Sequence, residues 1–315
     1  MNLQTRLDEL RELIESRLDG KVVNLPDLRQ QYIAFVQGKM QGRAYSLFPD
    51  DMERLIEELA GTHSAKVLAD IHQLVLIDLM LISLRSLDSA PIDDEYRHLE
   101  VLPTRVIDAV MEWYGYLVDS MTAGDYEPDT TSDLFRKDLA ISALNMWPSS
   151  SICHYEMRAL PRRFLTANGI AQFFSAADML LRKIKDRQHM YELHMEDRRK
   201  NPHFLEAGWR EFYLEIAQRL ETEPHVSGIF AQSWFWDPEV IKASPKMMYL
   251  RTLPESGGAR FYLLEECDDP LHVALQNKKR QRLYAQRMYI PKSYLMIWPR
   301  EMMLRWAKDL QPLCT

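Results

Sequence analysis

Cysteine is scarce in this chain, and its three cysteines stand far apart. Cys153, Cys267 and Cys314 form no CxxC pair, and an odd number argues against a framework of disulfides. Glycine and proline are also few, at 11 and 16 of 315 residues, which excludes a fibrous chain and argues against long disorder. We therefore expect a folded protein of a reducing compartment, the cytoplasm.

Long apolar runs without charge are absent as well. Residues 1–20 are too charged to contain the apolar core of a secretory signal, and we expect an ordinary first helix there. The most apolar stretch, Val67–Leu84, includes Asp70, His72 and Asp78 and is shorter than the roughly 20 clean residues of a membrane span. It predicts a buried helix and no membrane partner.

The net charge of −7 is unevenly distributed. Residues 1–225 carry −11, whereas residues 226–315 carry +4. Nucleic-acid binding requires a broad basic face, which an acidic body of this size does not offer. The charge therefore argues against a nucleic-acid partner and favours a small anionic ligand near the basic C-terminal part.

Helix start and stop residues recur before Pro224, and strand-like segments follow it. We predict a mostly α (α+β) fold, with a helical region over 1–223 and a small C-terminal mixed α/β section over 224–315. The two should be closely packed, and the second should hold a short, mainly antiparallel sheet. The predicted helices are 3–18, 26–40, 50–60, 64–86, 103–122, 132–146, 169–199 and 203–221. The later elements are strands at 226–237, 246–253 and 260–265, a helix at 271–287, a strand at 293–298 and a helix from Pro299.

The second and third of these strands flank the turn PESGGA, residues 254–259, which predicts a hairpin. Three antiparallel strands, a helix, a strand and a helix resemble the middle of GNAT-type acyltransferases, and the resemblance implies acyl transfer. The glycine-rich pyrophosphate loop of that family is replaced here by EECDDPLH, residues 265–272. Its acidic residues would repel a pyrophosphate, which argues against the usual mode of coenzyme A binding.

Asp78 is the most unusual ionisable residue of the helical region, because its neighbours are nearly all apolar. A carboxylate in such surroundings needs a partner or a function, since an unpaired buried charge costs several kcal/mol. An ion pair with Arg85, seven residues later and near the same face of the helix, is one interpretation. The other is a catalytic site in the helical core with Asp78 and His72 as its catalytic residues.

Glu95 and His98 form a Glu-x-x-His pair, the pattern that helical di-iron and di-manganese proteins place on facing helices. His189 follows Asp186 at the same spacing and, on the predicted helix 169–199, shares a face with Glu192 and Glu196. A chain with this many acids gives about one such pair by chance, so a solvated helix face is the competing interpretation. The predicted metal ligands are Glu95, His98, His189 and Glu192.

Cys153-His154-x-Glu156 brings together a thiol, an imidazole and a carboxylate in sequence. Adjacent residues point apart in any regular element, so Cys153 and His154 do not form a nucleophile and its base by adjacency.

The C-terminal section carries the predicted substrate-binding residues. Arg251 and Arg260 flank the PESGGA turn, where two like charges across a hairpin would need an anion between them. The basic helix 271–287 could complete a phosphate or carboxylate clamp, or its charges could simply complement the helix dipole. The residues predicted to contact substrate are Arg251, Arg260, Trp234, Trp236, Lys279 and Arg282.

Three functions remain open from the sequence. The first is an enzyme on a small anionic substrate (a carboxylate, phosphate or acyl thioester) bound between the helical body and the C-terminal section, with acyl transfer as a candidate reaction. The second is a helical metal-dependent oxidoreductase. The third is a non-catalytic protein that binds a partner through its Met- and Trp-rich C-terminal section. A homodimer is compatible with all three, and no cofactor is specified.

Overall fold

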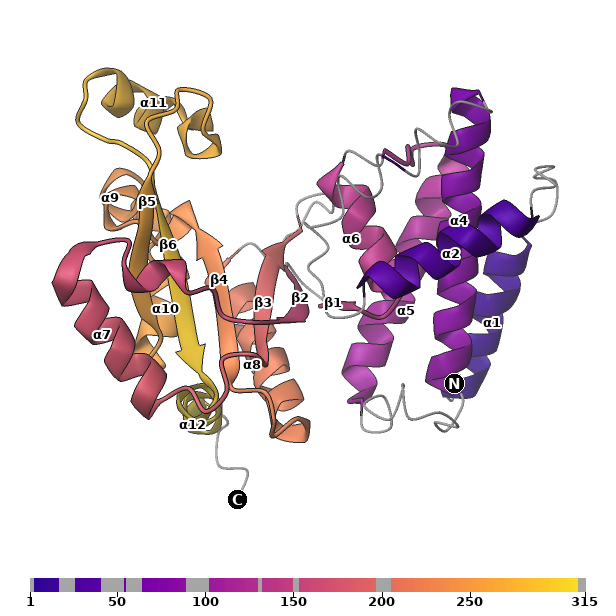
Figure 1. Ribbon diagram of the computed structural model, residues 1–315, viewed down its shortest axis with the longest axis horizontal. Helices are drawn as coiled ribbons and strands as arrows, with labels where there is room; N and C mark the ends of the chain where they lie inside the picture. Colours follow the sequence, from indigo (N-terminus) through magenta and orange to yellow (C-terminus); the bar gives the residue numbers. More distant parts are fainter. Residues whose placement is uncertain are drawn as a thin grey trace. The chain divides into compact units, whose positions relative to one another are not determined.

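The computed structural model describes residues 3–16, 26–40, 54, 64–88, 102–129, 132–149, 153–196 and 205–310. The chain forms two compact units, Met1–Ser150 and Ser151–Thr315 (Figure 1). Unit 1 is mainly helical and unit 2 is built on a β-sheet. The division falls well before residue 224, where the sequence predicts the change of structure.

Unit 1 is a group of helices around α4 (Ala65–Asp88). The helices that contact α4 are α1 (Leu3–Glu15), α2 (Pro26–Met40) and α6 (Asp133–Ser142). Helix α5 (Thr104–Ala123) contacts α1 and the short strand β1 (Met146–Pro148). These bounds confirm the predicted helices of this region, except for residues 50–60, which lie outside the described residues apart from position 54.

Helix α4 is the most apolar element of the chain. Its segment Lys66–Leu87 is long and apolar enough to cross a membrane by length and composition, and 61% of the apolar window is buried inside the structure. Ile71, Val75 and Met80 are fully buried. These side chains form the core of unit 1, in agreement with the buried helix that Val67–Leu84 predicts.

Unit 2 contains a mixed sheet. Strands β2 and β3 are antiparallel, β3 and β4 are parallel, and β6 is antiparallel to both β4 and β5. The parallel pair is joined through helix α8 (Glu206–Thr222), because parallel neighbours require a crossover connection. The strands lie in the order β2 (Cys153–Arg158), β3 (Met190–Met195), β4 (Gly228–Ser233), β6 (Lys292–Pro299) and β5 (Arg260–Glu266).

Helices cover both faces of this sheet. On one face, Ala176 and Met179 of α7 (Gly169–Arg182) pack against Phe230 of β4 and Ile297 of β6. On the other face, an aromatic cluster joins α8, β6 and α12 (Arg300–Leu310) to one another. Its ring centroids are 5.1 Å apart for Tyr213 and Trp298 and 5.0 Å apart for Trp298 and Trp306.

A buried ionic cluster fixes α8 to β3. Arg219 is 2% exposed, and its Nη2 lies 2.5 Å from Oε1 of Glu223. Its Nε donates to the hydroxyl of Tyr191 at 3.2 Å, and that hydroxyl donates to the second oxygen of Glu223. Burial raises the pKa of Tyr191 well above its usual value, so the phenol stays protonated and acts as the donor.

The predicted fold class is wrong about the sheet. Six strands among the described residues are spread from Met146 to Pro299, and do not form a short section after residue 224. The predicted helix 169–199 ends at Arg182, and its C-terminal part contains strand β3. From Tyr191 to Glu196 apolar and polar residues alternate, so a strand buries one apolar face there and a helix would not.

The predicted hairpin around PESGGA is also wrong. Residues 245–256 form the 3₁₀ turn η5 (Pro245–Met247) and helix α10 (Tyr249–Ser256) where a strand was expected. The other predicted elements of the C-terminal section are confirmed in their order, as β4, β5, β6 and α12. Two short elements that were not predicted, η4 (Trp234–Trp236) and α9 (Pro238–Ala243), follow β4. The predicted helix 271–287 is divided into η6 (Val273–Gln276) and α11 (Lys278–Ala285). The run of three antiparallel strands behind the acyltransferase resemblance is therefore absent from residues 226–265.

Candidate active site

Strands β2 and β3 carry ionisable side chains along one face, apart from Met190 at the start of β3. The register places His154 opposite His194 and Glu156 opposite Glu192. Opposed residues of neighbouring strands point to the same side of a sheet, so the ionisable groups gather on one face. The residues of this polar face are His154, Glu156, Arg158, Glu192, His194 and Glu196.

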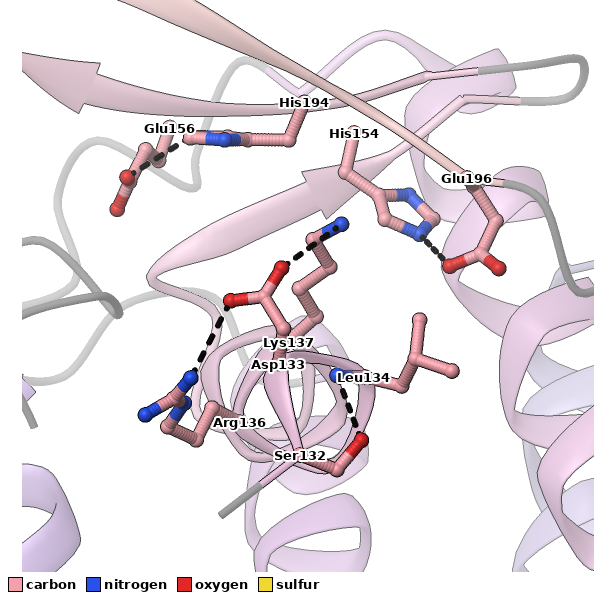
Figure 2. Close-up of polar contacts among 9 residues, drawn as sticks. All are labelled: Ser132, Asp133, Leu134, Arg136, Lys137, His154, Glu156, His194 and Glu196. Carbon is pink, nitrogen blue, oxygen red and sulfur yellow. Dashed lines mark hydrogen bonds and ion pairs between the residues drawn. The ribbon is translucent and has the colours of Figure 1, made fainter. Parts of the chain in front are cut away.

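These groups are in direct contact with one another (Figure 2). Nε2 of His194 lies 3.0 Å from Oε1 of Glu156, and Nε2 of His154 lies 3.0 Å from Oε2 of Glu196. Beside them, Nε of Arg158 donates to Oε2 of Glu192 at 3.3 Å. The polar face thus holds three carboxylates, two imidazoles and one guanidinium.

Burial makes this face chemically unusual. His154 is 1% and Glu156 2% exposed. Burial raises the pKa of Glu192 above its usual range, against the opposing effects of His194 and Arg158. A carboxyl group with a raised pKa is suited to exchange protons closer to neutral pH than an exposed glutamate.

Next to the polar face, the parallel strands β3 and β4 separate. Their register contains only Tyr191 opposite Ile229 and Glu192 opposite Phe230, although both strands continue for three more residues. In Figure 1 the two arrows lie close together where they begin and diverge toward their tips. We call the ends of the two strands beyond this pairing, residues 193–195 and 231–233, the β3–β4 opening; the name describes the lost pairing and not a cavity. The β3–β4 ladder does not reach these residues, whereas β3 stays paired with β2 and β4 with β6 along the same stretch.

Gln232 marks the β4 side of this opening. It lies two residues beyond Phe230, the partner of Glu192, and so points to the same face as the polar residues of β3. Its side chain accepts a hydrogen bond from Arg163 and donates to Oγ of Ser293 at 3.0 Å. Ionisable or amide side chains therefore flank the opening on both strands.

No family model matches the chain, and neither a curated protein nor a solved structure is significantly similar to it. The chemistry of the site is therefore derived from its own residues.

Asp78, a predicted catalytic residue, is paired with Arg29. The guanidinium of Arg29 donates to both carboxylate oxygens, with Nη2 at 2.7 Å from Oδ1 and Nε at 3.0 Å from Oδ2. An ion pair at Asp78 is thus present, with Arg29 of α2 as the partner, whereas the sequence predicts Arg85. A cavity of about 630 Å³ opens beside the pair, and Arg85 and Gln37 are among the residues that line it.

His72, the second predicted catalytic residue, lies in the core of unit 1. Its Nδ1 is 2.9 Å from the hydroxyl of Tyr32, and its ring meets Phe135 edge-on. Burial lowers the pKa of His72 to about 4. A neutral imidazole packed against aromatic rings contributes to the packing of the core. His72 does not line the cavity beside Asp78.

His72 should make the stability of unit 1 depend on pH. The unfolded chain binds a proton at His72 below about pH 6.5 and the folded one only near pH 4, so stability is complete above 6.5 and falls as pH drops between these values. We expect a loss of about 2 kcal/mol at pH 5. Urea unfolding followed by far-UV circular dichroism at pH 7 and 5 measures it, and His72→Gln should flatten the dependence. An equal pH dependence in the variant would contradict this assignment.

The predicted substrate residues of the C-terminal section have structural partners. Arg251 donates to the carbonyl of Trp236 and stacks on Phe261, 4.4 Å from the ring centroid. Arg260 lies 3.7 Å from Asp178. Since α10 and β5 carry the two arginines and no hairpin joins them, the argument for an anion between them no longer holds.

The two predicted tryptophans of this section also contact neighbouring residues of the fold. Trp236 is buried and donates to the carbonyl of Leu250 at 3.1 Å. Arg280 stacks on Trp234, 4.7 Å from the ring centroid. Lys279 and Arg282 lie exposed on α11. These contacts indicate packing and a solvated helix face.

The predicted metal ligands are divided. Glu95 and His98 lie outside the described residues. His189 is half-exposed and lies 2.6 Å from Asp186, whereas Glu192 belongs to the polar face. Cys153 points to the opposite face of the sheet from His154, as predicted from their adjacency. Among the polar-face residues, His194 and Arg158 were not predicted from the sequence, although the alternation of polar and apolar residues was present.

Proposed function

We propose that unit 2 is an acyltransferase whose acyl-thioester substrate binds in the β3–β4 opening. The observation that carries the proposal is the loss of strand pairing after Glu192 and Phe230, directly beside the polar face. An extended chain can be added where the pairing of two strands ends. The amide-containing pantetheine arm of coenzyme A is such a chain, and it ends in the thioester.

The end of β3 also favours an anionic carrier. Helix α8 begins soon after β3, and its N-cap Leu205 supplies no side-chain cap to the first-turn N–H groups. N–H groups at a helix start attract phosphates, although the first turn of α8 also carries Glu206. The sequence between β3 and α8 contains Arg198, Arg199 and Lys200 beside Glu196 and Asp197, three bases against two acids. A phosphate-bearing thioester is compatible with this charge. The proposal keeps the anionic substrate expected from the sequence but places it at the end of β3 and not at the residues predicted in the C-terminal section.

The polar face supplies the proton transfer. In the proposed reaction an acceptor amine or hydroxyl attacks the thioester carbonyl, so that a C–N or C–O bond forms while the C–S bond breaks. Glu192 takes the proton of the acceptor, and the leaving thiolate takes a proton from solvent. A backbone N–H of β3 in the opening would stabilise the charge on the carbonyl oxygen.

Calorimetric titration of the full chain with acetyl-coenzyme A and with coenzyme A tests this function. We expect binding of one molecule per chain. At a ligand concentration of 100 times the dissociation constant, the free energy of unfolding should rise by about 2.7 kcal/mol. Adenosine 3′,5′-bisphosphate, which lacks the pantetheine arm, should bind much more weakly. Absence of binding at millimolar acetyl-coenzyme A would refute the proposal, and binding of an extended peptide instead would favour a strand-adding interaction protein.

A further inference from the structure

The polar face contains a set of atoms arranged as metal ligands. One oxygen of Glu156, one oxygen of Glu192 and one nitrogen of His194 all lie within 4.8 Å of one another. Ligands that share a metal at bonds of about 2.1 Å are roughly 3.0–3.4 Å apart. The His194–Glu156 distance of 3.0 Å already has this value. Small rotations of the side chains would bring Glu192 within the same range.

We propose that Glu156, Glu192 and His194 bind a divalent transition-metal ion. Two carboxylate oxygens and one imidazole suit zinc, manganese and iron, which accept mixed oxygen and nitrogen ligands. All three residues project from paired positions of one antiparallel ladder, so the backbone fixes their spacing. This binding does not depend on acyl transfer.

Arg158 occupies the position that a cation would take. Its Nε is 3.3 Å from Glu192 and 4.0 Å from Glu156, and its side chain is 23% exposed. A bound dication and this guanidinium repel each other and compete for the same two carboxylates. Because Arg158 reaches solvent, it can turn outward when the metal binds.

The ion would also regulate the proposed acyl transfer. A metal that holds Glu192 and His194 removes the group that accepts the proton of the acceptor. The metal-bound enzyme should therefore be inhibited, and removal of the ion by a chelator should restore its activity.

Titration of chelator-treated full-length protein with Co²⁺ and Zn²⁺ tests the site directly. Visible absorption of Co²⁺ and calorimetry of Zn²⁺ should both show one stoichiometric ion, with affinity lowered about tenfold or more in His194→Ala and in Glu156→Gln. His189→Ala is the matched control, because His189 forms an exposed histidine–carboxylate pair with Asp186 at 2.6 Å. It should bind as the unchanged protein does.

The Arg158→Gln variant distinguishes the loss of a metal ligand from misfolding. We expect it to bind Co²⁺ several-fold more tightly, because the competing guanidinium is removed. A damaged fold would not increase the affinity for the metal. Absence of stoichiometric binding in the unchanged protein would overturn the proposal. So would a loss in His189→Ala equal to that in His194→Ala, or weaker binding in Arg158→Gln. Binding of acetyl-coenzyme A, measured separately, tells a failure of the metal site from a failure of the acyltransferase proposal.

Discussion

Replacing Arg219 with methionine is expected to lower the free energy of unfolding of unit 2 by about 3–5 kcal/mol. The substitution keeps the apolar stem but removes the charge that faces Glu223 and the donor to Tyr191. Glu223 is only 8% exposed, so its carboxylate would remain buried without its cation. Urea unfolding followed by tryptophan fluorescence measures the change, because most of the tryptophans belong to unit 2.

A second arginine on α8 provides the control. Arg210 pairs with Glu206 at 2.9 Å with the same spacing of four residues, but both side chains are largely exposed. Exposed pairs of this kind contribute about 0.3–0.5 kcal/mol, so Arg210→Met should hardly change the urea midpoint. Equal effects of the two substitutions would contradict the role of burial in the Arg219 cluster.

The Glu192→Gln variant is expected to lose about 10²–10⁴-fold in kcat for the proposed acyl transfer. Glutamine keeps the size of the side chain and can still accept a hydrogen bond from Arg158, but it cannot take a proton. Acetyl-coenzyme A should bind nearly as before, since the opening is formed by backbone. In the unchanged enzyme kcat should rise with pH, because burial raises the pKa of Glu192 and only its deprotonated form acts as a base.

Glu266→Gln is the matched control for this variant. Glu266 lies on β5, is exposed and pairs with Lys292 at 2.7 Å, so its substitution should leave kcat unchanged. Steady-state rates and titrations with acetyl-coenzyme A on the same preparations separate binding from chemistry. Full activity in Glu192→Gln would remove this residue from the mechanism.

The helices of unit 1 were predictable because their signals are local. Helix α5, for example, ends where Gly124 adopts a left-handed conformation that glycine favours, and the sequence marks this position. The partner of Asp78 was not predictable, since Arg29 lies 49 residues away on another helix and the contact exists only in the folded unit.

The polar face was not predicted, because residues 190–195 were assigned the 3.6-residue period of a helix and not the two-residue period of a strand. Glu192 and His194 are two residues apart, a spacing that places them on one face of a strand but on different sides of a helix. Assigning 169–199 to one helix therefore separated residues that β3 brings together. The β3–β4 opening could not be predicted at all, because it depends on where two strands far apart in sequence stop pairing.

Hydrogen–deuterium exchange with and without acetyl-coenzyme A tests the central claim most directly. If the thioester arm binds between the separated strands, amides of residues 193–195 and 231–233 should exchange more slowly in the complex, while those of β5 stay unchanged. Protection elsewhere in the chain, with no change at these six positions, would contradict the proposed site.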